Sequence, residues 1–156
     1  MVCLLMVLAL HSVTPDIREY VKILNDLQGT WSIEYVEHRG DKLETFTEKK
    51  IKLFDLQIKF DRQRFFFRLN NEWLPKEPLD AYEIYVSKSK TKGIVDFTLS
   101  IPFICNMGIY RITNNELTAC YAAFGLHDDK DIPKQFATSK QDHFYLVKLK
   151  KVKETK

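Results

Sequence analysis

The stretch Leu27-Gln28-Gly29-Thr30-Trp31 separates two kinds of secondary structure. Before it, residues 15–27 place apolar side chains at helical spacing, at Ile17, Tyr20, Val21, Leu24 and Leu27. After it, residues 30–37 alternate apolar and polar side chains, which is typical of a half-buried strand. We therefore predict a short N-terminal helix over residues 15–27 and strands from residue 30 onward, with Trp31 pointing inward from the first strand.

Alternation with a period of two recurs through the rest of the chain and predicts about eight strands in all. The later strands are expected at residues 56–61, 64–69, 82–87, 94–101, 108–113, 116–122 and 143–150. Residues 38–50 are expected to form a polar connection, and Trp73 to lie in a loop before Pro75. No segment between the strands fits a crossover helix, which parallel strands would need. The prediction is an all-β fold: an antiparallel meander β-barrel, since closure removes exposed sheet edges.

Asn114-Asn115 predicts a tight hairpin, because Asn tolerates the positive φ of a two-residue turn. With this turn, Cys120 lies opposite Ile109, and Cys105 is offset from Cys120 by four residues, or about 13 Å at the rise of a strand. A disulfide needs Cα atoms within about 7 Å. We therefore predict free thiols at both positions, unless residue 105 leaves the strand near Pro102.

The composition describes one globular domain. The chain has 156 residues, of which 45% are hydrophobic and 29% charged, and these values exclude a disordered chain. The net charge of +3 comes from the C-terminal end, where residues 148–156 hold five lysines and one glutamate. Residues 153–156 form a basic tail. A nucleic-acid-binding protein would more often spread its basic residues over a folded face, so nucleic acid is not expected as a partner.

The N-terminal residues 2–10 form a short apolar run followed by small and polar residues. This pattern is typical of a secretory signal peptide, which we place at residues 1–12. The run is too short for a membrane-spanning helix, which needs about 20 apolar residues. We therefore expect a secreted or extracytoplasmic domain at residues 13–152. The alternatives are a core strand or a wrongly assigned chain start.

Gly29-Thr30-Trp31, after a helix and before a many-stranded meander, resembles the Gly-x-Trp signature of lipocalins and related calycin barrels. Three later stretches resemble a lipocalin-like domain family of unknown function that is abundant in planctomycete bacteria: Gly108-Ile109-Tyr110-Arg111-Ile112, Asn115-Glu116-Leu117 and Cys120-Tyr121-Ala122. Ile132-Pro133-Lys134-Gln135-Phe136 matches a loop of that family but has Ile132 where Arg is usual. The resemblance spans residues 27–152 and implies a lipocalin-like barrel. It implies little about activity.

Aromatic side chains from different strands are candidates for one shared interior and a ligand-binding role: Tyr35, Phe60, Phe67, Phe97, Tyr110 and Tyr121. Such a lining suits a small, largely apolar ligand. Gly29 and Trp31 are expected to form a structural plug at one barrel end, with a cation from the last strand over the Trp ring. The alternatives are a filled core, with the barrel rim serving as a protein-interaction or inhibitory module, or an enzyme on the same scaffold.

The sequence contains no recognisable catalytic motif. Its four histidines are widely separated, and His127 with Asp128 and Asp129 is best interpreted as a polar loop. Cys120 is expected to be a buried small hydrophobe, since it lies within a strand with no neighbouring base. We therefore predict no catalytic residues, no metal, no cofactor and a monomeric protein.

Overall fold

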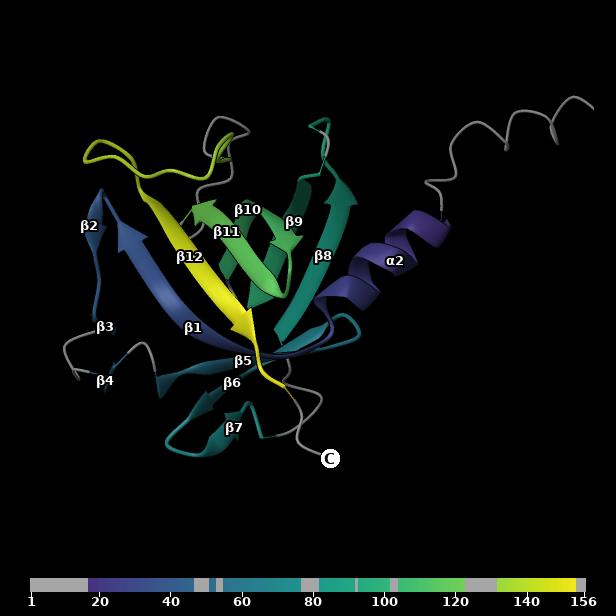
Figure 1. Ribbon diagram of the computed structural model, residues 1–156, viewed down its shortest axis with the longest axis horizontal. Helices are drawn as coiled ribbons and strands as arrows, with labels where there is room; N and C mark the ends of the chain where they lie inside the picture. Colours follow the sequence, from purple (N-terminus) through teal and green to yellow (C-terminus); the bar gives the residue numbers. More distant parts are fainter. Residues whose placement is uncertain are drawn as a thin grey trace, which may run out of the picture.

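The computed structural model describes residues 17–46, 51–52, 55–76, 82–91, 93–101, 104–122 and 132–153. It confirms the predicted all-β fold. Eight strands form the barrel: β1 (Gly29–His38), β5 (Gln57–Asp61), β6 (Arg64–Leu69), β8 (Tyr82–Lys88), β9 (Val95–Ile101), β10 (Ile104–Thr113), β11 (Glu116–Ala122) and β12 (Phe144–Lys151) (Figure 1).

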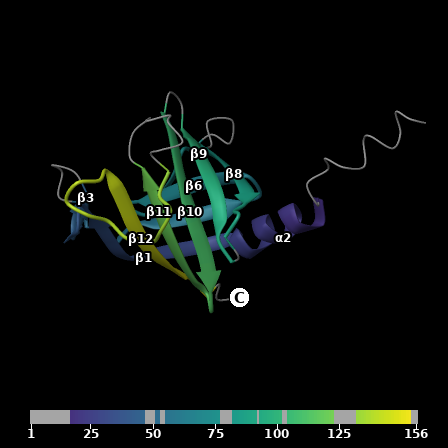
Figure 2. The same ribbon diagram turned by 90° about the horizontal axis from the view of Figure 1, so that it is seen from above.

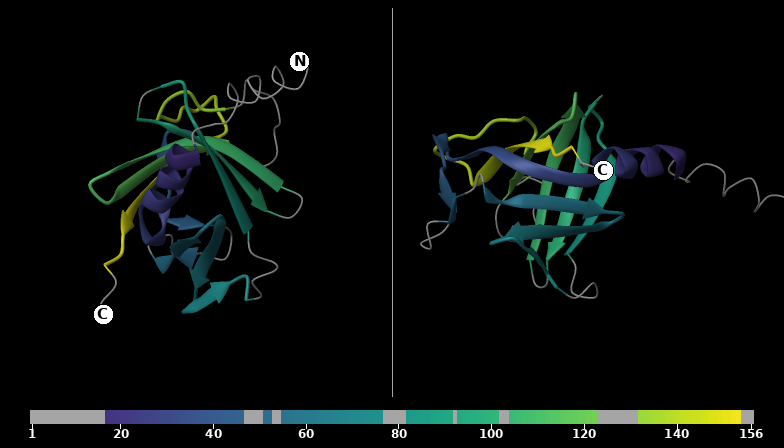
Figure 3. Two further views of the ribbon diagram at one scale, coloured as in Figure 1. Left: turned by 90° about the vertical axis from the view of Figure 1, so that its right-hand side faces the viewer. Right: turned by 60° about the horizontal axis from the view of Figure 1, so that its bottom comes forward.

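Each of these strands pairs antiparallel with its neighbours in the barrel. The order is β12-β11-β10-β9-β8-β6-β5-β1, and β1 also pairs with β12, which closes the sheet into a barrel. β8 to β11 run side by side along one wall (Figure 3). The predicted meander is therefore correct.

The hairpin between β10 and β11 has the predicted register. Asn114 and Asn115 have φ of 51° and 66°, and Ile109 pairs with Cys120. Cys120 is a free, buried cysteine, as predicted. The backbone of Cys105 pairs with that of Ser100, and the structure describes only the backbone of Cys105.

The N-terminal helix α2 spans Ile17–Leu27 and extends to one side of the barrel (Figures 1 and 2). Its C-terminal half packs on the barrel core through Leu24 and the buried Leu27. The expected apolar stripe is wrong at two positions, because Ile17 is 69% exposed and Val21 47% exposed. The reason is geometric: a helix that leaves the barrel surface cannot bury the first turns of its apolar face.

Two expected loops contain strand residues. The polar connection holds β2 (Asp41–Lys42) and β3 (Thr45–Phe46), and β3 pairs with β4 (Ile51–Lys52). Trp73 belongs to β7 (Glu72–Leu74), which pairs with β6 through a turn at Asn70-Asn71. Both Asn residues have positive φ, so the same turn chemistry as at residues 114–115 makes a hairpin here. The proposed signal peptide and most of the basic tail lie outside the described residues.

The buried side chains form two clusters on opposite faces of the barrel wall. The larger cluster lies in the interior and includes Trp31, Phe60, Phe65 and Phe97. The smaller cluster lies outside the wall and contains Ile109, Cys120 and Leu146. We call residues 132–143, which lead into β12, the strap. Its fully buried Pro133 and partly buried Phe136 belong to the packing outside the wall.

Candidate functional site

Trp31 lies near the start of β1, at one end of the barrel. Its side chain is fully buried, and its indole Nε1 donates a hydrogen bond to the Leu27 carbonyl oxygen at 2.8 Å. The Nζ atom of Lys151 lies 5.3 Å from the centre of the Trp ring. Gly29 has φ of 107°, a value that side-chain-bearing residues rarely adopt. The expected cation from the last strand is therefore present at the ring.

Five of the six predicted ligand-binding residues belong to the interior cluster: Phe60, Phe67, Phe97, Tyr110 and Tyr121. Tyr35 does not, because it packs with the cluster outside the wall. The β1–β12 register shifts between Ile33 and Tyr35, so β1 bulges at Glu34. A bulge adds one residue to a strand, which sends every later side chain to the opposite face. The expectation of Tyr35 inside the barrel is therefore wrong.

A row of residues crosses five strands of the interior wall, and four of these strands contribute an aromatic side chain. Strand pairing aligns Phe97, Gly108, Tyr121, Tyr145 and His38. The rings of Tyr121 and Tyr145 are stacked with centroids 5.7 Å apart, and those of Tyr145 and His38 are stacked at 4.2 Å. Phe97 meets Tyr121 at 6.4 Å in an edge arrangement. Neither Tyr145 nor His38 is among the six candidate residues predicted from the sequence. Tyr145 lies on the same face of β12 as Val147 and Leu149, which are buried inside the barrel. His38 reaches this face of β1 only because of the bulge at Glu34.

Gly108 allows a close approach between β10 and β11 within this row. A Cβ atom at this position would lie 2.3 Å from the Cys120 carbonyl oxygen and 2.6 Å from the Tyr121 Cβ atom. Only a residue without a side chain can hold β10 this close to β11 at this point.

The interior is partly exposed at the end away from Trp31. Phe67, Leu99, Tyr121 and Tyr145 all face the interior cluster, yet each is only partly buried. They lie near strand ends that the antiparallel order brings to one end of the barrel, together with His38. We call these five residues the aromatic end. Trp31, Phe60 and Phe65 near the opposite end are buried.

The aromatic end carries two uncommitted hydroxyl groups. Among the described residues, the hydroxyls of Tyr121 and Tyr145 have no hydrogen-bond partner. Burial raises the pKa of Tyr121 well above its ordinary value, so its hydroxyl keeps its proton and can donate it. The hydroxyl of Tyr110 differs, because it is sealed from solvent and also lacks a partner. Burial likewise raises the pKa of Tyr110.

Outside the barrel, Tyr35 helps to hold the strap. Its hydroxyl donates to the Glu37 carboxylate, which also accepts from the Thr138 hydroxyl. These two hydrogen bonds lower the pKa of Glu37, and the one from Thr138 has the larger effect. The Gly40 amide donates to Thr138 Oγ1 at 2.8 Å. The Cys120 thiol faces the Ala137 carbonyl oxygen at 3.7 Å, and burial raises its pKa to about 11. A thiol with such a pKa is a poor nucleophile at neutral pH.

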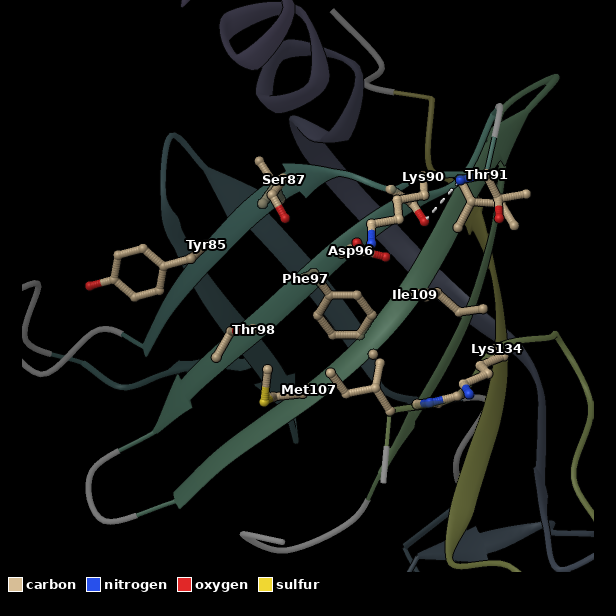
Figure 4. Close-up of a pocket in the computed structure, with 16 residues that line it drawn as sticks. Tyr85, Ser87, Lys90, Thr91, Asp96, Phe97, Thr98, Met107, Ile109 and Lys134 are labelled. Atoms are coloured by element: carbon tan, nitrogen blue, oxygen red, sulfur yellow. Dashed lines mark hydrogen bonds between the residues drawn. The ribbon is translucent and has the colours of Figure 1, made fainter. Parts of the chain in front are cut away.

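A groove of about 650 Å³ lies on the outer face of β8, β9 and β10, beside the strap (Figure 4). Its floor includes Asp96, Thr98 and Ile109, and Ile132–Lys134 form part of its wall. A second groove of about 520 Å³ lies between α2 and β10. Two of the lysines that line it already have partners: Lys22 lies 2.6 Å from Asp26, and Lys88 lies 2.9 Å from Glu19.

The described residues include no group of three or more His, Cys, Asp or Glu side chains that could hold a metal ion. None of the described helices is long and apolar enough to cross a membrane. Comparisons of the chain with models of known protein families, with curated proteins and with solved structures give no match.

Proposed function

We propose that the protein binds a small, uncharged, largely apolar ligand at the aromatic end of a lipocalin-like barrel. One observation carries the proposal: aromatic side chains that face the barrel interior remain partly exposed at that end. The exposed parts of these side chains are available for contact with a ligand. Aromatic side chains with a few polar groups among them are the usual lining of a small-molecule site.

The charge pattern favours an uncharged ligand. Among the described residues, no charged or non-aromatic polar side chain is buried in the barrel. A charged ligand would lose its hydration with no counter-charge to replace it, which is costly. The two tyrosine hydroxyls of the aromatic end can donate to an oxygen or nitrogen acceptor. The proposed ligand is therefore a planar or flexible apolar molecule with a polar acceptor at one end.

The proposal includes the lipocalin-like family and secretion. The family assignment is supported by Gly29 and Trp31 after a helix and by Lys151 over the Trp ring. Secretion rests on the apolar run at residues 2–10 alone. N-terminal sequencing of the protein produced in its own cells tests it: a start near Val13 supports secretion, and an intact Met1 contradicts it.

Two neutral fluorescent probes test ligand binding. Nile red carries a ring carbonyl, whereas diphenylhexatriene has no polar atom. We expect both to bind one molecule per barrel at micromolar concentrations. Replacing Tyr121 and Tyr145 together with Phe should weaken Nile red binding about tenfold, since each lost hydrogen bond contributes about 0.5–1.5 kcal/mol. Diphenylhexatriene binding should stay within about twofold, because the rings remain.

Matched controls separate binding at the aromatic end from adsorption to the surface. Tyr85→Phe removes a hydroxyl from the outer face, where the side chain is 48% exposed, and should leave both affinities unchanged. Tyr121→Ala removes a ring of the row and should weaken both probes. If neither probe binds the wild-type protein, the proposed function is wrong and the rim-interaction alternative gains support.

A further inference from the structure

We propose that the groove outside the barrel is a second binding site, for a short apolar peptide held by both of its charged termini. This site is independent of the aromatic end, because the barrel wall separates the two. Its lining includes outward side chains of β8, β9 and β10, residues 89–91 after β8, and the strap (Figure 4).

Strand register determines which side chains form the floor of the groove. Asp96 pairs with Ser87 on one side and Ile109 on the other, and Thr98 pairs with Tyr85 and Met107. All six side chains point outward, opposite to Phe97. The floor therefore has a polar part near β8 and an apolar part at Met107 and Ile109, on which aliphatic side chains can pack.

The wall of the groove is held in place before any ligand arrives. Pro133 is fully buried, and Arg111 lies over the Phe136 ring at 4.9 Å. Further along the strap, Thr138 donates a hydrogen bond to Glu37 and accepts one from the Gly40 amide. A fixed wall lowers the ordering cost of binding.

Asp96 is the group that selects a cation. It is partly buried on the groove floor, and among the described residues it has neither a hydrogen-bond nor an ion-pair partner. Lys90 lines the same part of the groove without forming an ion pair with Asp96. An unpaired, partly buried carboxylate is stabilised by an ammonium group. The hydroxyls of Ser87 and Thr98 beside it can accept further ammonium hydrogen bonds.

Lys134 supplies the opposite charge from the strap side of the groove. Asp96 lines the groove from β9 and Lys134 lines it from the strap, and Ile109 of β10 belongs to the same lining. An extended chain covers about 3.3–3.6 Å per residue, so a tripeptide is roughly 10 Å long. A peptide of that length can place its ammonium at Asp96 and its carboxylate at Lys134, with its side chains over Ile109 and Met107.

Calorimetric titration with the tripeptide Leu-Ala-Leu, its N-acetyl form and its C-terminal amide tests the site. We expect one-to-one binding of the free peptide, and about tenfold weaker binding after either terminus is capped, as for loss of a charged hydrogen bond. Asp96→Asn should weaken the free peptide by the same factor and leave the acetylated peptide unchanged. Lys134→Gln should likewise weaken the free peptide about tenfold and leave the amidated peptide unchanged.

The capped peptides also report on folding, because an unfolded variant would lose them as well. Asp61→Asn changes an exposed carboxylate on β5 and should leave all three affinities unchanged. Equal binding of free and acetylated peptide, an Asp96→Asn variant with wild-type affinity, or no binding by any of the three would each overturn the proposal. Nile red affinity should not change in Asp96→Asn, since that probe tests the aromatic end.

Discussion

Replacement of Trp31 by Ala tests whether this side chain closes the barrel. The side chain is fully buried, and it forms a hydrogen bond to Leu27 and a cation contact with Lys151. Truncation of a buried Trp or Phe costs about 3–5 kcal/mol through lost burial and the cavity left behind. The unpaired Leu27 carbonyl places the expected value in the upper half of that range, because a buried acceptor without a partner is costly. The total free energy of unfolding of most domains is about 5–15 kcal/mol, so this loss is a large fraction of it.

Urea unfolding followed by far-UV circular dichroism measures the change. With a slope of about 2 kcal/mol per M, a loss of about 4 kcal/mol lowers the midpoint by about 2 M. Trp73→Ala is the matched control, because Trp73 is half-buried on β7, and we expect it to cost about 1 kcal/mol. If Trp31→Ala costs no more than Trp73→Ala, Trp31 does not close the barrel.

Three further predictions concern Gly108, Tyr110 and Glu37. Gly108→Ala should cost about 3 kcal/mol in urea unfolding, since its Cβ would lie 2.3 Å from a backbone oxygen; Gly93→Ala, where nothing lies within 4 Å, should cost less even though its φ is positive. Tyr110→Phe should leave the unfolding free energy unchanged or raise it by up to about 1 kcal/mol, because it removes a buried hydroxyl without a partner; a clear loss of stability would show that the hydroxyl has one. The lowered pKa of Glu37 stabilises the fold above the ordinary value of 4.5, and this contribution is lost as the pH falls through the folded-state pKa. The stability difference between wild type and Glu37→Gln should therefore shrink below about pH 4.5, and a constant difference down to pH 3 would contradict the role of this carboxylate.

Local turn chemistry explains why much of the fold could be predicted from the sequence. Asn114-Asn115 sets the β10–β11 register, because only one pairing fits a two-residue turn. The same rule applies at Asn70-Asn71. This second Asn-Asn turn forms a hairpin around Trp73, where a loop was expected. Strand faces followed from alternation wherever pairing was regular, which placed five of the six candidate aromatic residues inside.

The remaining features depend on contacts between distant segments. The bulge at Glu34 has no Gly or Pro to mark it, and it appears only in the pairing of β1 with β12. It moved Tyr35 outside and left His38 stacked on Tyr145. The strap has no periodicity, and residues far away in the sequence hold it, as in the hydrogen bond between Thr138 and Glu37.

Both proposed sites depend on one register, because they use alternate residues of the same strands. On β9, Phe97 faces the interior and Asp96 faces the groove; on β10, Gly108 lies in the aromatic row and Ile109 lies beneath the strap. A slip of one residue would place the carboxylate inside the barrel and the ring outside, destroying both sites together. The tight turn at Asn114-Asn115 and the close approach at Gly108 oppose such a slip. The stretch around these residues therefore maintains the side-chain arrangement that both proposed sites need, one on each face of the barrel wall.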